Sequence, residues 1–238
     1  RLAPYLHFGQ IGIREIYHKL AGMGDKVMNG YVRQLYWRDF AHHLIYHFPH
    51  SVDRALRPEY EQFPWSHDEG KLERWRKGQT GFPVIDAAMR QLWQTGWMHN
   101  RARMVVGSFL VKHLLQDWQS GADWFWDTLV DADLPNNTMG WQWVAGCGAD
   151  AAPYFRVFNP LRQAERFDKG GDYVRKYIPE LANIPGDEIN EPWNLTPIEL
   201  ASYGIKLGES YPERMIDLNE GRDRALAAYQ EFKQAREG

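Results

Sequence analysis

The chain has 238 residues, a formal net charge of −3 and one cysteine. This length suits one large domain or two small ones, and the overall charge does not indicate a polyanion partner, so a DNA-binding face would have to be a local patch. The single cysteine excludes an internal disulfide, which suits a reducing cytosol, and neither a signal peptide nor an apolar run of membrane-spanning length is visible.

Apolar residues recur at helical spacing along most of the chain. The pattern predicts helices over residues 13–20, 29–48, 70–77, 83–96, 98–118, 121–130 and 219–236. Gly22 and Gly24 are expected to stop the first of these helices, and Pro49 to end the second. Because almost no period-two alternation and no convincing linker are found, we expect an all-α fold with a single domain over residues 1–238. The chain begins without methionine, which suggests a piece of a longer protein.

Residues 131–143 gather polar and aromatic side chains in one short stretch, in a chain that is already rich in tryptophan, with 11 of them. Asp131 and Asp133 stand one residue apart, and two amides and two indoles follow. Carboxylates accept hydrogen bonds from the hydroxyls or ring N–H groups of a ligand, and flat indoles stack on a flat ring. Pro135 and Gly140 indicate a loop between helices within this stretch. A helix-capping pair of aspartates beside core tryptophans would account for the same residues.

A second candidate surface lies on the predicted helix 29–48. Gln34 and Trp37 are three residues apart and share a helix face, and Arg38 lies beside them. An amide, an indole and a guanidinium on one face could grip a base or a cofactor. An ordinary amphipathic helix explains the same three residues.

Positive charge gathers in two places. Asn100 can cap the predicted helix 98–118, and Arg101 and Arg103 in its first turn suit phosphate or carboxylate partners. Residues 154–176 carry a local surplus of three positive charges with aromatic residues interleaved, which could lie on a DNA backbone. A capped helix with solvated arginines, and a solvated basic face, are the alternatives.

Two features suggest other chemistries only weakly. His43 and His47 have the i, i+4 spacing of a zinc pair, but no third ligand follows at a sensible spacing, so we expect no metal. Cys147 has no obvious base partner in the sequence, so a catalytic thiol is not expected. There is neither a Walker loop nor a Gly-x-Gly-x-x-Gly after a strand, so a nucleotide would be held by other means.

Six sequence strings, in this order and at this spacing, resemble the FAD-binding helical domain of the photolyase/cryptochrome family. They are LAPYLHFG (2–9), QLYWRDF (34–40), TGFPVIDAAMRQL (80–92), TGWMHNRARM (95–104), DADLPNNTMGWQW (131–143) and DAAPYFRVFNP (150–160). The resemblance covers at least residues 1–193. Within the family, Asn100 and Asn137 are similar to photolyases that act on cyclobutane pyrimidine dimers, and the string that starts at Asp131 looks most like the class III bacterial photolyases.

This resemblance implies an all-α FAD-binding domain without the N-terminal α/β antenna domain of the family. It implies a deoxyribodipyrimidine photolyase, a lyase, that repairs cyclobutane pyrimidine dimers in DNA by light-driven electron transfer from reduced, non-covalent FAD. Damaged DNA is the expected partner, with no membrane and no metal, and we expect a cytoplasmic bacterial monomer. The antenna chromophore, which the missing domain would bind, is left open.

The resemblance also implies a role for individual residues. The implied cofactor contacts are Leu2, Tyr31, Arg38, Asn100, Arg103, Asp131, Asp133 and Asn137, with Arg103 pairing with Asp131. The implied contacts to the damaged bases or their backbone are Gln34, Trp37, Asn100, Arg101, Met104 and Trp143, with the two indoles on either side of a flipped-out dimer. The implied catalytic set is the electron relay Trp141, Trp118 and Trp65, together with Asn137 beside the flavin nitrogen that gains or loses a proton.

The chain departs from the family pattern at two places. Gln34 stands where most cyclobutane-dimer photolyases have glutamate, and because glutamine cannot supply a proton we expect slower or less efficient repair. Ala3 replaces a serine of the phosphate-binding motif, and the Thr-Ser pair that grips the FAD phosphates would precede Arg1. The second departure bears on the affinity of this chain for FAD.

Two other functions use the same features. A cryptochrome-like blue-light photoreceptor would bind the same flavin without repairing DNA, and a flavin-free helical module would bind nucleic acid alone. Asn100, Asn137 and the paired Trp37 and Trp143 favour repair.

Overall fold

The computed structural model describes residues 1–21, 23, 25–154 and 156–237. Gly22 and Gly24, at which the sequence predicts a helix stop, lie outside the described residues, as do Phe155 and Gly238.

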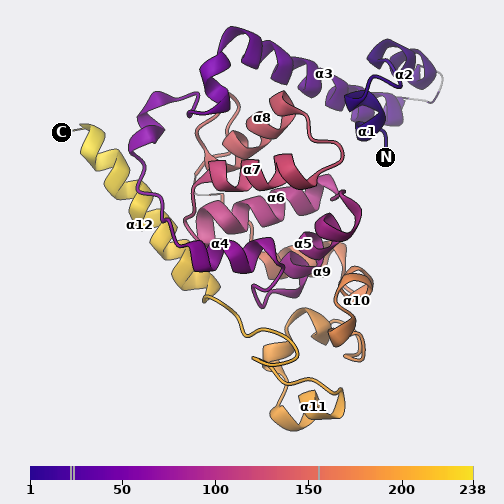
Figure 1. Ribbon diagram of the computed structural model, residues 1–238, viewed down its shortest axis with the longest axis vertical. Helices are drawn as coiled ribbons and strands as arrows, with labels where there is room; N and C mark the ends of the chain where they lie inside the picture. Colours follow the sequence, from indigo (N-terminus) through magenta and orange to yellow (C-terminus); the bar gives the residue numbers. More distant parts are fainter. Residues whose placement is uncertain (22, 24, 155, 238) are drawn as a thin grey trace.

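The described residues form α-helices joined by short turns (Figure 1). The helices are α1 (Ala3–His7), α2 (Ile13–Leu20), α3 (Asp25–His47), α4 (Glu69–Arg76), α5 (Pro83–Thr95), α6 (Asn100–Ser108), α7 (Trp118–Thr128), α8 (Leu134–Ala145), α9 (Pro160–Phe167), α10 (Asp172–Tyr177), α11 (Pro197–Ser202) and α12 (Leu218–Glu237). The turns are η1 (Pro49–Val52), η2 (Pro58–Gln62), η3 (Phe109–His113), η4 (Pro179–Leu181), η5 (Glu188–Asn190) and η6 (Pro192–Asn194). Within the described ranges, β-type pairing is limited to two isolated bridges. The predicted all-α fold class is confirmed.

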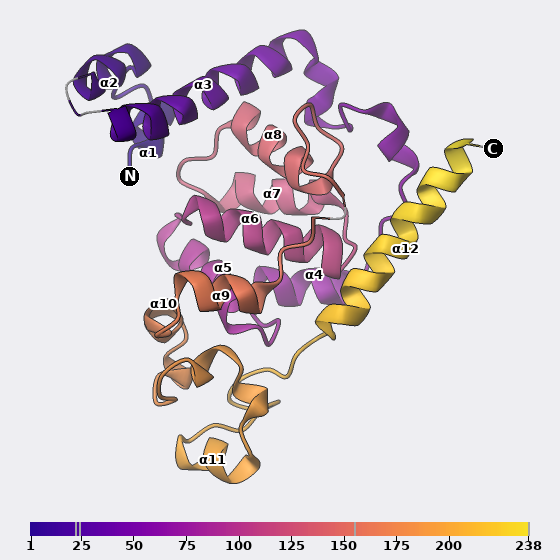
Figure 2. The ribbon, with the colours of Figure 1, turned by 180° about the vertical axis from the view of Figure 1, so that it is seen from behind.

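Helices α4 to α8 lie in the middle of the molecule, and α3 runs along one edge of this group and packs on α8 (Figures 1 and 2). Helix α12 lies along the flank and packs on η3. Helices α1 and α2 lie at the N-terminal end of α3, and α10 leads to α11 at the opposite end of the molecule. None of the helices in the described part of the chain has the length and apolar character that a membrane crossing requires.

Two clusters of buried apolar side chains hold these helices together. The larger cluster contains Trp75, Phe82 and Phe109, which are fully buried, and it includes Trp141 of α8. The smaller cluster surrounds Ile178 and packs the turns that follow α10. Each such large side chain contributes about 1.5–3 kcal/mol of burial free energy. Because α6, α7 and α8 all contribute to the larger cluster, it fixes the mutual placement of these three helices.

The prediction of a single long helix over residues 98–118 is wrong. Helix α6 ends at Ser108, the chain continues as a π-helical turn to His113, and Leu115 then takes a φ of +56°. This left-handed conformation ends the helix, and Asp117 starts α7 because its carboxylate accepts a hydrogen bond from the backbone N–H two residues later at 3.2 Å. The residues on both sides of the break are buried in one core, so the apolar spacing runs through it unchanged.

The loop expected within residues 131–143 covers only its first three residues. Helix α8 begins at Leu134 and continues through Gly140. Pro135 stands in the first turn, where the missing backbone N–H has no intrahelical partner to lose. The carboxylate of Asp133 caps the helix by accepting a hydrogen bond from the backbone N–H three residues later at 3.2 Å.

The N-cap of α6 is His99, not Asn100 as predicted. The ring nitrogen Nδ1 of His99 accepts a hydrogen bond from the backbone N–H of Arg101 at 3.1 Å. Asn100 is therefore the first helical residue, and its amide Nδ2 lies 3.9 Å from the sulfur of Met104, one turn further along the same face.

We predict that Gly121→Ala lowers the free energy of unfolding by about 1–3 kcal/mol, because overpacking a tight core forces neighbours to move. A Cβ at Gly121 would overlap the six-membered ring of Trp141. Gly30→Ala is the control, since a Cβ there meets nothing within 4 Å in α3, and it should raise the free energy of unfolding by roughly 0.5–1 kcal/mol. Urea denaturation measures both, and equal midpoints for Gly121→Ala and the parent chain would contradict the prediction.

Candidate functional site

A cavity of about 340 Å³ opens between helices α3, α6, α7 and α8. Its volume lies within the range of roughly 300–1,000 Å³ that small-molecule sites occupy. It is lined by Gln34, Trp37, Asn100, Arg103, Met104, Gly107, Phe125, Leu129, Asp131, Ala132, Asp133, Asn136, Asn137, Met139, Gly140, Trp141, Trp143, Val144, Ala149 and Asp150. The residues come from segments far apart in the sequence, and α8 with the turn before it contributes half of them.

Most of the site residues that the sequence predicts line this one cavity. They are Gln34, Trp37, Asn100, Arg103, Met104, Asp131, Asp133, Asn137, Trp141 and Trp143. Those that do not line it are Leu2, Tyr31, Arg38, Arg101, Trp118 and Trp65. The structure therefore brings the predicted cofactor and substrate residues together without separating the two groups.

The predicted cofactor and substrate residues outside the cavity have other surroundings. Leu2 precedes α1 and is 37% exposed, and Tyr31 is half-buried on α3, which raises the pKa of its hydroxyl. The guanidinium of Arg101 lies over the ring of Phe167 at 5.2 Å. Arg38 does not line the cavity itself but reaches one of its carboxylates.

The three relay tryptophans differ in burial. Trp141 and Trp118 are both 3% exposed, whereas Trp65 is half-buried and packs on Phe63 with ring centroids 4.3 Å apart. Of the three, Trp141 lines the cavity and Trp65 is the most exposed. Trp141 packs edge-on against Phe125 at 5.0 Å, and its buried indole N–H has no hydrogen-bond partner in the described part of the chain.

Arg103 holds the first carboxylate of the cavity. Its Nη2 donates to both oxygens of Asp131, at 2.9 Å and 2.8 Å, and its Nε donates to the carbonyl of Met98 at 2.8 Å. The side chain of Asp131 is only 3% exposed, so the pair that the resemblance implies is largely withdrawn from water. Burial of an unpaired carboxylate is costly, and Arg103 on α6 therefore ties this helix to the turn before α8.

Arg38 holds the second carboxylate from the opposite side. Its Nη1 lies 2.7 Å from Oδ2 of Asp133, and the side-chain amide of Asn136 donates to Oδ1 at 2.5 Å. Burial alone would raise the pKa of Asp133, but the hydrogen bonds from Asn136 and Arg38 outweigh it and hold the pKa below its usual value. Asp133 therefore remains a carboxylate at neutral pH.

Asn137 presents an acceptor to the cavity. Its Nδ2 donates to the carbonyl of Ala122 on α7 at 2.9 Å, which fixes the orientation of the amide. Its Oδ1 has no hydrogen-bond partner among the described residues. The oxygen can accept a hydrogen bond from an N–H group of a bound ring.

Sequence reasoning missed several lining residues. Asn136 belongs to the Asn-Asn pair in the stretch 131–143, and its place at the third position after a capping aspartate was a usable signal. Met139 lies within the stretch 131–143, but an apolar side chain there gave no chemical signal. Phe125 of α7 and Asp150, which follows α8, reach the cavity through tertiary packing.

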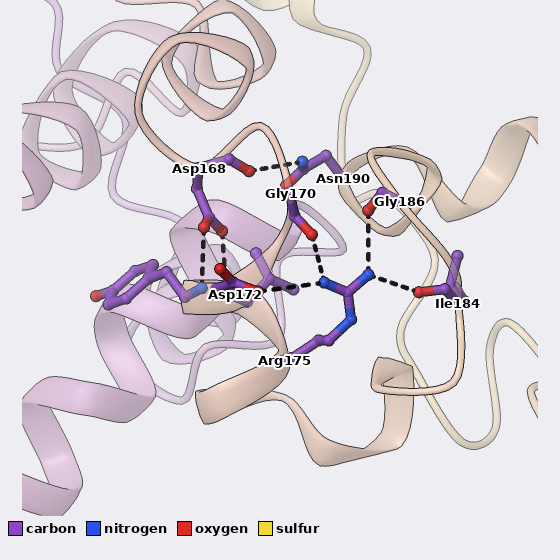
Figure 3. Close-up of polar contacts among 9 residues, drawn as sticks. Asp168, Gly170, Asp172, Arg175, Ile184, Gly186 and Asn190 are labelled. Carbon is purple, nitrogen blue, oxygen red and sulfur yellow. Dashed lines mark hydrogen bonds and ion pairs between the residues drawn. The ribbon is translucent and has the colours of Figure 1, made fainter.

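The basic stretch 154–176 is only partly a free surface. Arg156, Arg162 and Arg166 are exposed, but Arg175 is half-buried and turns inward. Figure 3 shows its guanidinium among backbone carbonyls. It donates to the carbonyls of residues 170, 184 and 186, the last two at 2.8 Å and 3.1 Å. The prediction of a basic face over the whole stretch is wrong for Arg175, because that charge closes the turns after α10.

His43 and His47 lie next to each other in α3, with ring centroids 4.3 Å apart and the ring planes tilted by 59°. Within the ranges that the structure describes, no group of three or more His, Cys, Asp and Glu side chains is placed to hold a metal ion.

Comparison with known proteins identifies relatives along nearly the whole chain. Residues 31–231 match the family described as the FAD binding domain of DNA photolyase. The chain is 44% identical to the deoxyribodipyrimidine photo-lyase of Agrobacterium fabrum over 98% of this chain and 49% of that protein. It is 37% identical to cryptochrome-1 of Arabidopsis thaliana over 98% of this chain and 36% of that protein.

A solved structure gives the same picture. The crystal structure of a bacterial class III photolyase from Agrobacterium tumefaciens superposes with a TM-score of 0.94 at 44% identity, covering 98% of this chain and 49% of that one. The chain spans about half the length of the photolyases that it matches.

We predict that Arg103→Met lowers the free energy of unfolding by about 2–4 kcal/mol, because it leaves the buried carboxylate of Asp131 without its partner. The double variant Arg103→Met/Asp131→Leu should recover most of this loss, since both charges are then removed. Arg162→Met, on the exposed face of α9, is the control for loss of an arginine. Urea denaturation of the variants tests the coupling, and additive effects of the two substitutions would show that the pair does not matter.

Proposed function

The chain belongs to the family of FAD-binding domains of DNA photolyases, and we propose that its cavity holds FAD non-covalently in a protein that repairs cyclobutane pyrimidine dimers in DNA under light. The observation that carries this proposal is the content of one cavity. Two carboxylates fixed by arginines, an asparagine with a free acceptor and three indoles all line it. This combination suits a flat, hydrogen-bonding ring system and a flat substrate next to it.

The residues of the cavity fit a flavin. Asp131 and Asp133 offer acceptors on the turn before α8, and the free Oδ1 of Asn137 offers another from the first turn of that helix. We propose that Asn137 faces the flavin nitrogen that gains or loses a proton and that the reduced form is the active one. The bound reduced flavin would supply light-driven electron transfer to the dimer. The chain's own part is to bind, orient and exclude water.

The substrate would enter the same cavity from its open side. Trp37 on α3 and Trp143 on α8 would stack on a flipped-out dimer, and base–aromatic stacking stabilises a bound base by about 1–3 kcal/mol. A damaged pair of bases costs less to extrude than normal bases, which favours the dimer over intact DNA. Asn100 and Met104, one helical turn apart on α6, line the same opening.

Two further assignments rest on the proposed flavin site. Trp141, Trp118 and Trp65 would carry electrons from the surface to oxidised flavin, in keeping with the burial of the first two and the greater exposure of Trp65. We also propose that residues 1–238 form a single domain, because α12 packs on η3 and the ring of Tyr229 stacks on that of Tyr154 at 4.6 Å.

The test has two steps. First, the absorption spectrum of the purified chain, before and after addition of FAD, shows whether flavin binds. Second, the reduced, FAD-loaded chain is illuminated with an oligonucleotide that contains one thymine dimer, and the loss of the dimer is followed against a dark control. Loss of the dimer only in the light supports the proposal. Bound FAD without loss of the dimer would favour a cryptochrome-like photoreceptor, and DNA binding without flavin would favour a nucleic-acid module.

We predict that Gln34→Glu raises the yield of repair per absorbed photon by roughly two- to fivefold, because a protonated glutamic acid side chain can supply a proton to the reduced dimer and glutamine cannot. Gln34 is exposed and lines the cavity from α3. Gln230→Glu, an exposed position on α12, adds the same charge away from the cavity and should leave the yield unchanged. An unchanged yield for Gln34→Glu would show that position 34 does not limit repair.

A further inference from the structure

Phe167 is an exposed aromatic residue in contact with two arginines from different helices. It is the last residue of α9, and its side chain is 54% exposed. The guanidinium carbon of Arg101, in the first turn of α6, lies 5.2 Å from the centre of the ring, and that of Arg166 lies at the same distance. Both distances fall within the range of about 6 Å over which a cation is attracted to an aromatic face. One surface ring therefore holds two positive charges.

The ring and the first of the two arginines stand on fixed backbone. The carboxylate of Asp168, directly after Phe167, accepts hydrogen bonds from the backbone N–H groups of Tyr173 and Val174 at 2.9 Å and 3.1 Å (Figure 3). On α6, the backbone N–H of Arg101 donates to the N-cap side chain of that helix at 3.1 Å. The ring and the start of α6 are thus held in place before any ligand binds.

The hydrogen-bond donors of both guanidiniums remain available. Among the described residues, neither Arg101 nor Arg166 forms a side-chain hydrogen bond or an ion pair with a carboxylate. Arg103 and Arg175 differ, since their donors are used by a carboxylate and by backbone carbonyls. A contact with an aromatic face uses the charge of a guanidinium but none of its N–H groups. The pair on Phe167 can therefore still bind an anion.

Two positive charges on one ring suit a chain of phosphates. Each charge lies 5.2 Å from the same ring centre, so the two cannot be further apart than twice that distance. A DNA strand carries one negative charge for about every 3.4 Å of helix axis, so neighbouring phosphates fall within this spacing. The fork of a guanidinium matches the oxygens of a phosphate. Asn100, directly before Arg101, lines the cavity, so the pair stands beside the proposed entrance for the damaged bases.

We propose that Phe167 is a positioning residue, which holds the side chains of Arg101 and Arg166 ready to bind phosphates of the DNA strand that enters the cavity. By restraining two long side chains in advance, the ring lowers the conformational entropy that they lose when DNA binds. The DNA partner rests on the proposed function, whereas the contacts of the ring do not. Because Phe167 does not line the cavity, its loss should weaken binding and leave the light-driven step unchanged.

The contacts of the ring are tested first without DNA, by proton NMR of the arginine side chains. In the parent chain, the ring should shift the signals of Arg101 and Arg166, and Phe167→Leu should remove these shifts. Phe167→Tyr keeps an aromatic face and should keep them. The signal of Arg162, an exposed residue one turn earlier on α9, should be the same in all three proteins. Equal signals of Arg101 and Arg166 in the parent chain and in Phe167→Leu would show that the ring does not hold them.

DNA binding is then measured in the dark by fluorescence anisotropy, with an oligonucleotide that contains one thymine dimer. Phe167→Leu should weaken binding roughly three- to fivefold, and Phe167→Tyr should bind like the parent chain. The undamaged oligonucleotide should lose affinity by the same factor, because phosphate contacts carry no sequence information. The repair yield per bound dimer should not change. Equal affinities of the parent chain and Phe167→Leu would overturn the proposal.

A double-mutant cycle separates positioning from a general loss of structure. Arg166→Gln should weaken binding and lower the slope of log affinity against log salt concentration by about 1. In the Phe167→Leu background, the same substitution should weaken binding by a smaller factor, because the charge is no longer held in place. Arg162→Gln, on the same helix, should have equal effects in both backgrounds. If the effects of Phe167→Leu and Arg166→Gln are simply additive, the ring does not position Arg166 and the inference is wrong.

These outcomes also separate the role of Phe167 from the proposed repair. DNA binding that depends on Phe167 as expected, but without loss of the dimer in the light, contradicts repair and leaves the role of Phe167 intact. Repair by the parent chain and by Phe167→Leu with equal affinity for DNA contradicts the role of Phe167 alone. A parent chain that binds neither oligonucleotide contradicts that role whether or not FAD binds.

Discussion

Two carboxylates withdrawn from water, in the turn before α8, constrain the rest of the site. Asp131 and Asp133 have side chains only 3% and 11% exposed, and charges so placed need partners. Neither of the positively charged partners comes from α8, because Arg103 belongs to α6 and Arg38 to α3. Helices α3, α6 and α8 must therefore meet at this turn, and the cavity is the space that remains where their side chains do not fill it.

The packing behind this turn is set by small residues next to large ones. Trp141 is accommodated only because position 121 on α7 has no side chain, and Gly107 on α6 also lies close to the six-membered ring of this indole. The same indole lines the cavity, so the close approach of α7 and α8 also determines the shape of the site. The orientation of Asn137 depends on the close approach of α7 and α8 as well, because its side-chain amide donates a hydrogen bond to a backbone carbonyl of α7. The same contacts between α6, α7 and α8 therefore determine both the stability of the fold and the geometry of the site.

Much of the fold and of the site could be predicted from the sequence, and the errors have physical causes. Helical spacing of apolar residues predicts most of the helices, because each of them buries one face. The same spacing continues across the break at Leu115, so the sequence pattern gives no sign of the break. Gly140 suggested a loop, but it lies within α8, where the fold provides the helix with packing that outweighs the residue's low propensity. The cap of α6 was assigned to Asn100, although a histidine one residue earlier does the same work with its ring nitrogen. Asp150 and Phe125 reach the cavity only through tertiary packing, which a local pattern does not contain.

Two arginines show why residue type and local charge do not by themselves reveal what a positively charged side chain does in the folded protein. Arg103 and Arg175 both look like candidates for a phosphate, but the first is consumed by a carboxylate and the second by three backbone carbonyls. An arginine whose donors are already used inside the protein contributes little to a surface that attracts phosphates. The positive charge of this stretch that remains on the surface is that of the exposed side chains Arg156, Arg162, Arg166, Lys169 and Lys176. In a chain with a net charge of −3, the exposed positive charge of residues 154–176 is therefore smaller than the sequence alone indicates, and it lies on α9, on α10 and on the segments on either side of α9.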